Sequence, residues 1–116
     1  MRYQKIYLRF LSLVQAIEAK GELPALDPEA KQLLEMVAVK HGAGQDMTIS
    51  DAMGLKQIAS PATLHRKIDI LRGLGLIETH FEGDNKRTKY LRPTDQAAQY
   101  FSTLGSIIEN AGATTV

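Results

Sequence analysis

The sequence has 116 residues, enough for one domain with a hydrophobic core but too few for two independent ones. It contains no cysteine, which excludes a disulfide framework, a thiolate nucleophile and a cysteine zinc site, and which agrees with a reducing compartment such as the cytoplasm. The net charge of +1 hides an uneven distribution: residues 55–92 hold eight Lys and Arg against four Asp and Glu, a balance of +4, whereas the remainder holds six against nine, a balance of −3. Positive charge concentrated in one part of a chain is typical of a surface that binds nucleic acid.

The first predicted element is an amphipathic helix over residues 1–20. Its apolar residues recur at the three-and-four spacing of one buried face, and the polar residues between them exclude a signal peptide and a membrane span. Leu8 and Leu11 lie off this stripe, so the helix has more apolar surface than one contact can cover, and we expect a second partner for it. Gly21 ends the helix. The stripe consists of Tyr3, Ile6, Tyr7, Phe10, Leu13, Val14 and Ile17.

A second helix is predicted to begin after Asp27 and to end near Gly42. An Asp side chain can accept hydrogen bonds from the free amides of a helix start. Proline at position 28 is tolerated at the first helical position, because an amide hydrogen there would have no partner within the helix. The predicted core face of this helix consists of Ala30, Leu33, Leu34 and Val37.

Residues 48–73 contain the pattern of a helix-turn-helix. Thr48 and Asp51 resemble a capping box that opens a short helix, which Gly54 closes. After a turn, Ser60 and the proline that follows it open another helix, which continues to Gly73. Two helices joined by a short turn form this motif. Leu64, Ile68 and Leu71 are predicted to point into the core.

A hairpin and a final helix complete the predicted fold. Residues 76–81 and 88–92 are rich in residues that favour strands, and the turn-forming residues between them predict a hairpin, the wing, over residues 76–92. Thr94 caps a last helix over residues 94–111, which carries a second apolar stripe. The fold is therefore expected to be mainly α-helical with a small β-hairpin: a single winged helix-turn-helix domain over residues 1–116, with its N- and C-terminal helices available for dimerisation.

The basic residues fall on the two parts of such a fold that would touch DNA. Ala62, Thr63 and Arg66 point away from the core, and Arg66 is expected to pair with a guanine edge in the major groove. His65 lies on the flank of this face and Lys67 near the core boundary, and both are expected to contact phosphate or to remain solvated rather than to read bases. The cations of the wing suit a minor groove and its phosphates. The predicted DNA-binding residues are Ser60, Ala62, Thr63, His65, Arg66, Lys67, Lys86, Arg87 and Lys89.

From Thr48 to about Leu104 the sequence resembles the MarR-type winged-helix transcriptional regulators. The segment SPATLHRKIDILRGLGLIE matches their recognition-helix pattern, and GDNKRTKYLRPT resembles their wing, with Asp84 and Arg87 in matching places. The resemblance implies a homodimer, held by the terminal helices, that binds a near-palindromic operator. Only about two dozen residues follow the wing, where such regulators have a longer C-terminal helical region. A small-molecule effector is compatible with the family, but no cluster of residues in this sequence indicates one.

Catalysis has little support in the sequence. His41, His65 and His80 lack the spacing of a helical metal pair, and no nucleophile is tied to a general base by local spacing, so neither an enzyme nor a metal or cofactor site is predicted. We predict a cytoplasmic, sequence-specific regulator that binds double-stranded DNA, without membrane association, and that represses transcription as a homodimer. Two alternatives remain open. A winged helix can bind protein instead, which the partly outward Ile70 favours, or it can bind DNA without regulating transcription.

Overall fold

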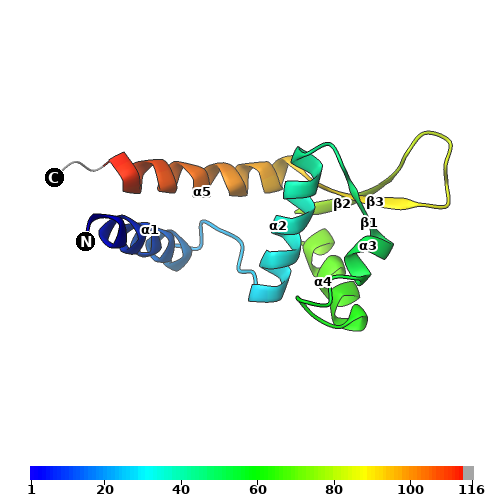
Figure 1. The fold of residues 1–116 in the computed structure, drawn as a ribbon, viewed down its shortest axis with the longest axis horizontal. Coiled ribbons are helices and arrows are strands. Elements are labelled where there is room, and N and C mark those ends of the chain that lie inside the picture. The colour runs from blue at the N-terminus through cyan, green and yellow to red at the C-terminus, as the bar shows by residue number, and fades with distance from the viewer. Residues whose placement is uncertain (114–116) are drawn as a thin grey trace. The chain divides into compact units, whose positions relative to one another are not determined.

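The computed structural model describes residues 1–113, which form five helices and three strands (Figure 1). In chain order these are α1 (Arg2–Ala19), α2 (Pro28–Gly42), β1 (Met47–Thr48), α3 (Ile49–Met53), α4 (Pro61–Gly73), β2 (Ile77–Phe81), β3 (Lys89–Pro93) and α5 (Asp95–Ala113). The order of elements confirms the predicted winged helix-turn-helix. The last helix extends two residues beyond its predicted end at Ala111.

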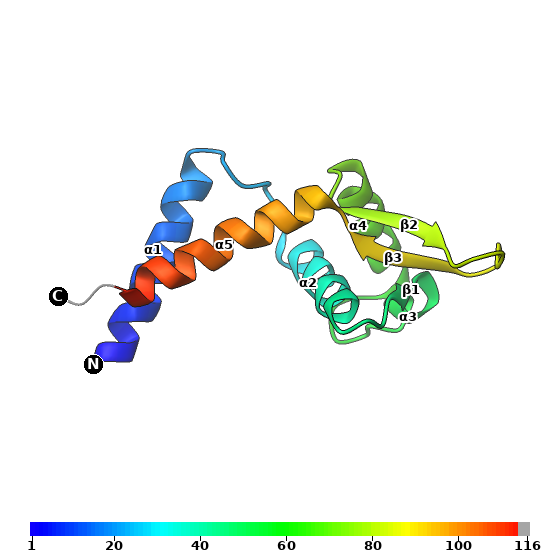
Figure 2. The ribbon, with the colours of Figure 1, turned by 90° about the horizontal axis from the view of Figure 1, so that it is seen from above.

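The chain forms two compact units. Leu26–Ala97 make up the winged-helix unit, and residues 1–25 together with α5 from Ala98 onward make up the terminal-helix unit. In the winged-helix unit the three strands form an antiparallel sheet in the order β1-β3-β2. Strands β2 and β3 run side by side and, together with the projecting loop that joins them, form the wing (Figure 2).

The helix starts form where the sequence places capping residues. Asp27 accepts a hydrogen bond from the amide of Ala30 at 2.9 Å. Thr48 accepts from the amide of Asp51 at 2.9 Å, and the Asp51 carboxylate accepts from the Thr48 amide at 3.1 Å, so the capping box is complete. Ser60 accepts from the amide of Thr63 at 3.3 Å, with proline in the first turn of α4. These contacts confirm the three predicted helix starts.

The core of the winged-helix unit lies between α2, α4 and the sheet. Every predicted inward residue of α2 and α4 is buried, which confirms the two helix faces derived from the sequence. Ile77 on β2, Leu91 on β3 and Leu76, directly before β2, add to this core. Met47 on β1 and Ala52 on α3 are also buried in it. The outward face of α4 is thereby fixed, because the opposite side of the helix is anchored in the core.

Strand β1 is an element that the sequence did not predict. Met47 lies opposite Leu91, and Thr48 lies opposite Tyr90, so the segment after α2 is the third strand of the sheet rather than a loop. Two residues are too few to show the alternation of a strand. This pairing nevertheless fixes β3, the middle strand, between β1 and β2.

The terminal-helix unit consists of α1 and α5, which cross near the C-terminal end of α5 (Figures 1 and 2). On α5, Ile107 and Ala111 are buried. The prediction that the apolar stripe of α1 is buried is wrong for the single chain: α1 has no buried residue, and Tyr3 and Tyr7 are 76% and 59% exposed. A pair of crossed helices has too little surface to cover such a stripe. No helix within residues 1–113 is long and apolar enough to span a membrane.

Candidate nucleic-acid interface

The N-terminal end of α4 carries a chain of side-chain hydrogen bonds on its outward face. The Ser60 hydroxyl donates to Thr63 Oγ1 at 3.1 Å, and Arg66 Nη2 donates to the same oxygen at 3.0 Å. Arg66 is exposed, and its guanidinium is held back along the helix toward the helix start. The residue pattern placed Thr63 and Arg66 on this face, but it did not show that they are joined.

This chain determines what α4 presents to a ligand. A hydroxyl has two acceptor positions and one donor, so Thr63 Oγ1, which already accepts twice, has only its hydrogen left to offer. Arg66 has donors alone. Ala62, which is exposed, adds no bulk beside them. The start of α4 is therefore a surface of hydrogen-bond donors, suited to a partner that supplies acceptors.

His65 and Lys67 lie apart from these residues. His65 is exposed and lies 3.7 Å from the Asp69 carboxylate, a solvated pair that contributes little energy. Lys67 is only 18% exposed; its Nζ lies 3.1 Å from Asp27 Oδ2 and 3.8 Å from Glu29 Oε1 in the first turn of α2. The structure therefore gives Lys67 an acidic partner within the protein instead of a free position on the outward face.

The Lys67 contact and the helix cap act together on Asp27. The hydrogen bond from the Ala30 amide and the contact with Lys67 lower the pKa of Asp27 below its ordinary value, because both stabilise the carboxylate. Asp27 is thus ionised at neutral pH and joins the first turn of α2 to the middle of α4.

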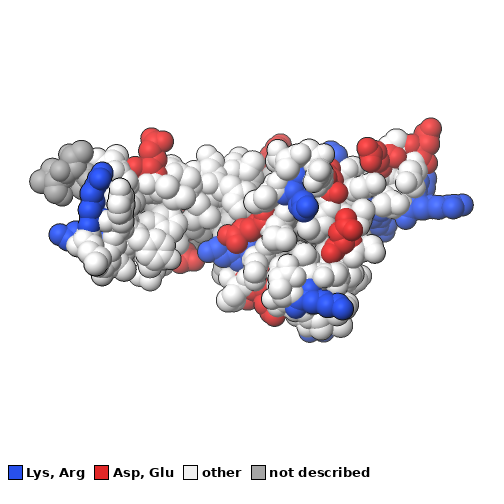
Figure 3. Space-filling view, viewed as in Figure 1, with Lys and Arg blue, Asp and Glu red and all other residues white. Residues whose placement is uncertain are grey.

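The wing places its three predicted cations in different surroundings. Lys86 Nζ lies 5.8 Å from the centre of the Phe81 ring, within the range of a cation–π contact. The Arg87 amide donates to Asn85 Oδ1 at 3.0 Å, which shapes the turn and leaves the guanidinium exposed. Lys89, in the first position of β3, is also exposed. The end of the wing shows Lys and Arg side chains beside acidic ones (Figure 3).

A shallow hollow of about 320 Å³ separates the wing from α3. Arg87 and Lys89 line one side of it, and Ser50, which is exposed, lines the other. Two cations and a hydroxyl around one hollow suit an anion such as a phosphate. The sequence analysis missed Ser50, because only the pairing of β1 with β3 brings the start of α3 next to the wing.

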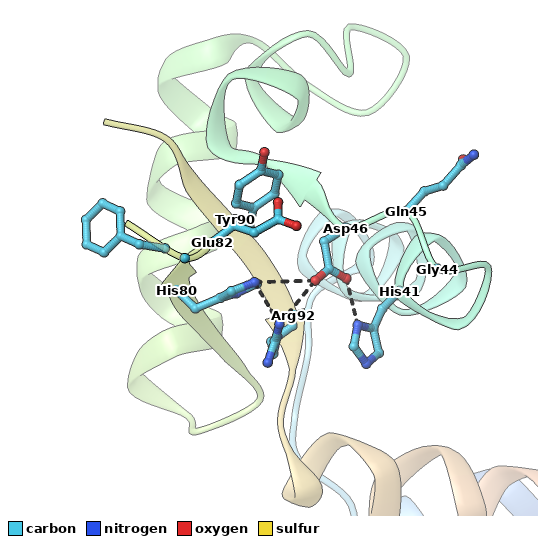
Figure 4. Close-up of a pocket in the computed structure, with 10 residues that line it drawn as sticks. His41, Gly44, Gln45, Asp46, His80, Glu82, Tyr90 and Arg92 are labelled. Atoms are coloured by element: carbon cyan, nitrogen blue, oxygen red, sulfur yellow. Dashed lines mark hydrogen bonds and ion pairs between the residues drawn. The ribbon is translucent and has the colours of Figure 1, made fainter. Parts of the chain in front are cut away.

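A second polar site lies on the other side of the sheet, in a hollow of about 670 Å³ between the end of α2 and strands β2 and β3 (Figure 4). His41 Nδ1 lies 2.6 Å from Asp46 Oδ1, and the other oxygen of Asp46 lies 3.5 Å from both His80 Nε2 and Arg92 Nη2. Burial opposes the charge of Asp46, but the hydrogen bond with His41 and the nearby charges outweigh it and hold the pKa of Asp46 below its ordinary value. The sequence placed His41 at a helix end and His80 on a strand, but it did not show this cluster.

Within residues 1–113 no three His, Asp or Glu side chains are grouped in a way that could hold a metal ion. The cluster around Asp46 is joined instead by hydrogen bonds and ion pairs among its own members.

The sequence and the fold were compared with those of known proteins. No protein-family model matches the sequence, and neither does any curated protein sequence. Among solved structures, an uncharacterized SlyA-like transcription regulator from Listeria monocytogenes is similar over 97% of this chain and 71% of its own, with a TM-score of 0.54 and 24% identity. The adhesin competence repressor from Streptococcus pyogenes is similar over 85% of this chain and 69% of its own, with a TM-score of 0.54 and 19% identity.

A protein from Archaeoglobus fulgidus is similar over 72% of this chain and 88% of its own, with a TM-score of 0.55 and 21% identity. The fold of this chain is thus that of MarR- and SlyA-like regulators, which confirms the resemblance at the level of fold. At these identities the likeness carries the architecture and not the contacts of individual residues.

Proposed function

We propose that the protein binds duplex DNA as a homodimer and regulates transcription, with α4 in the major groove and the wing at the flanking minor groove. The observation that carries this proposal is the donor surface at the start of α4, where Thr63 and Arg66 lie on the outward face of a helix whose other side is anchored in the core. The structural neighbours named as regulators support it. Repression would follow from occlusion of the polymerase.

The donor surface favours one kind of base edge. Guanine presents two acceptors, N7 and O6, in the major groove, whereas adenine and cytosine each present a donor there. Arg66 and the free hydrogen of Thr63 both donate. They therefore suit the two acceptors of a guanine edge, or one guanine edge together with an acceptor of a neighbouring base. The amides at the start of α4 and the Ser60 cap suit a neighbouring phosphate.

Arg87, Lys89 and Ser50 supply the phosphate contacts on the wing side, around the hollow that separates the wing from α3. Contacts of this kind fix the position of a protein on the duplex without selecting a sequence. Lys67 is not included in the proposed contacts, because its ammonium is already paired with Asp27 and Glu29.

The proposed homodimer rests on α1 and α5. The apolar stripe of α1 has no buried residue in the single chain, and Tyr7, Leu8 and Ile108 are each more than half exposed. Exposed apolar surface of this extent marks an interaction site. A second copy of the chain covers it most economically, because two-fold dimers are the commonest oligomers and match a near-palindromic operator.

Fluorescence anisotropy with a random duplex across a salt series tests DNA binding. We expect the logarithm of the affinity to fall with the logarithm of salt concentration with a slope of magnitude about 4 or more, because several phosphates are neutralised. Absence of binding at low salt would contradict the proposal.

Arg66→Ala tests the base contact once an operator has been selected from random sequence. We expect it to weaken operator binding by about 1–3 kcal/mol and to bring operator and random DNA closer in affinity. Arg72→Ala is the matched control, since Arg72 is an exposed arginine in the last turn of the same helix. Equal effects of the two substitutions on base discrimination would disprove the assigned contact.

A second candidate function is protein binding by α4. Ile70 and Leu74, one turn apart at the end of α4, are 44% and 39% exposed, and such a pair can dock against a partner. This candidate predicts that Ile70→Ser abolishes the interaction with that partner while Arg66→Ala does not. A protein that shows no salt-dependent DNA binding would favour it.

A further inference from the structure

The cluster around Asp46 joins four parts of the winged-helix unit. His41 comes from the last turn of α2, Asp46 directly precedes β1, His80 lies on β2, and Arg92 lies on β3. Figure 4 shows the side chains of His41, His80 and Arg92 converging on the Asp46 carboxylate. We call these four residues the clasp. Arg92 ties β3 directly to Asp46, and the contact of His80 with Arg92 joins β2 to the same cluster.

The contact between His80 and Arg92 makes the clasp sensitive to the proton on His80. His80 Nε2 lies 2.7 Å from Arg92 Nη2, and an arginine nitrogen can only donate. A hydrogen bond between these two atoms requires His80 Nε2 to accept, which is the arrangement of a neutral imidazole with its single hydrogen on Nδ1. If His80 gained a second proton, two donors, both cationic, would face each other at 2.7 Å.

Two atoms of the clasp have no hydrogen-bond partner. His80 Nδ1 and Arg92 Nε are both buried, and both are donors in this arrangement. Buried donors without partners cost free energy, so the contacts visible here do not satisfy the clasp fully.

We infer that the clasp positions the wing for DNA, and that protonation of His80 shifts the wing by expelling Arg92 and moving the attachment to Asp46 from β3 to β2. This inference rests on the proposed function. Once protonated, His80 can donate to Asp46 Oδ2, which already lies 3.5 Å from Nε2, and Arg92 then loses both His80 and its share of Asp46. The link from β3 to Asp46 is broken, and a direct link from β2 to Asp46 forms in its place.

The charged groups around His80 agree with this exchange. Asp46 faces it from the segment before β1, Arg92 from β3, and Glu82 lines the same hollow from the wing turn. The ring of Tyr90 lies 5.6 Å from the imidazole ring, and the His41 side chain reaches His80 only through Asp46. Because the pKa of Asp46 lies below its ordinary value, Asp46 remains ionised between pH 5.5 and 8 and is there to receive the new proton donor.

The test measures DNA binding between pH 8 and pH 5.5 in a His65→Gln background, which removes the imidazole on α4. We expect the affinity for a fixed duplex to fall about 5- to 30-fold at 0.15 M salt as the pH is lowered, with a salt slope smaller by about 1–2, as for the loss of one or two phosphate contacts. His80→Gln should abolish this pH dependence, because glutamine keeps an acceptor for Arg92 but cannot be protonated. His41→Gln is the matched control and should retain it, since His41 contacts the other carboxylate oxygen of Asp46 and the substitution leaves His80 and Arg92 in place.

A pH dependence that survives His80→Gln, or that is absent in the parent, would overturn the inference. A second measurement does not depend on DNA. Nitrogen-15 NMR of the imidazole should show neutral His80 with its proton on Nδ1, and the amide signals of residues 82–89 should shift together with the titration of His80. A neutral His80 with its proton on Nε2 would also refute the inference, as would amide signals of residues 82–89 that do not change while His80 is titrated. Failure to bind DNA at every pH would refute the proposed function alone, since the NMR result would still decide whether the clasp switches.

Discussion

Replacing Lys67 with methionine distinguishes a cation that stabilises the fold from one that binds phosphate. Methionine keeps most of the aliphatic stem, which is largely covered, and removes the ammonium that lies 3.1 Å from Asp27 Oδ2 and 3.8 Å from Glu29 Oε1. The partners left behind, Asp27 and Glu29, are 40% and 43% exposed, so water solvates them after the substitution.

The size of the effect follows from this exposure. Removing one partner of a fully buried pair costs about 3–5 kcal/mol, because a charge is left without solvent, whereas exposed pairs contribute about 0.2–1 kcal/mol. Because Lys67 is largely covered while Asp27 and Glu29 are open to water, we expect Lys67→Met to lower the free energy of unfolding by about 1 kcal/mol. The helix cap from Asp27 to the Ala30 amide is unaffected, so α2 itself remains formed.

Two assays check this prediction together. Urea unfolding at pH 7 should show the loss of stability, and the anisotropy salt series should show an unchanged slope for the folded protein. Lys89→Met is the matched control in the same assays: it should leave stability within about 0.5 kcal/mol and lower the magnitude of the slope by about 0.9, the value of one phosphate contact. A slope reduced by Lys67→Met as much as by Lys89→Met would refute the assignment of Lys67 to the fold.

Three further predictions follow from the helix cap, the terminal helices and the clasp. Ser60→Ala should lower the free energy of unfolding by about 1 kcal/mol, because the cap on the Thr63 amide is lost, and Ser60→Asp, which can still cap, should recover most of that in urea unfolding. Tyr7→Glu should convert the dimer to a monomer by light scattering at micromolar concentration, whereas Gln15→Glu, on a polar position of α1, should not; a monomeric parent protein would disprove the dimer. Asp46→Asn should lower the free energy of unfolding by about 1–3 kcal/mol at pH 7. Since the pKa of Asp46 is lowered in the folded protein, this difference should be fully present above about pH 4 and should disappear as the pH falls through the lowered pKa, as urea unfolding at pH 7 and pH 3 can show.

The helices of the winged-helix unit could be predicted because each begins with a local signal. Asp27, Thr48 and Ser60 each accept from an amide three residues ahead, and such contacts need nothing from the rest of the chain. The inward faces of α2 and α4 followed from the spacing of apolar residues, which is also a local property. The outward position of Arg66 follows directly from the inward position of Leu64.

The contacts that the sequence did not show join residues far apart in the chain. Lys67 meets Asp27 across 40 residues, and Arg92 meets Asp46 across 46. Neither pair has a periodic signature, so Lys67 looked like any other cation of a basic segment. The apolar stripe on α1 does have a periodic pattern. Periodicity shows which face of a helix is apolar, but it does not show whether that face is buried by the same chain or by another one.

The two elements that we propose to contact DNA are both attached to α2. The first turn of α2 holds α4 through Asp27 and Lys67, and its last turn holds the wing through His41 and the rest of the clasp. With 15 residues, α2 is about 22 Å long, and the part from Ala30 to Val37 is anchored in the core. A rigid rod of this kind sets the separation between a recognition helix and a wing, and therefore the register between a major groove and the next minor groove. The two ends of α2 differ in their titratable groups: the contact at the start of the helix joins a lysine to two carboxylates, whereas the clasp at its end contains two imidazoles. A change in proton concentration would act on the wing and leave α4 in place, lowering the affinity for all sequences alike and preserving the choice among them.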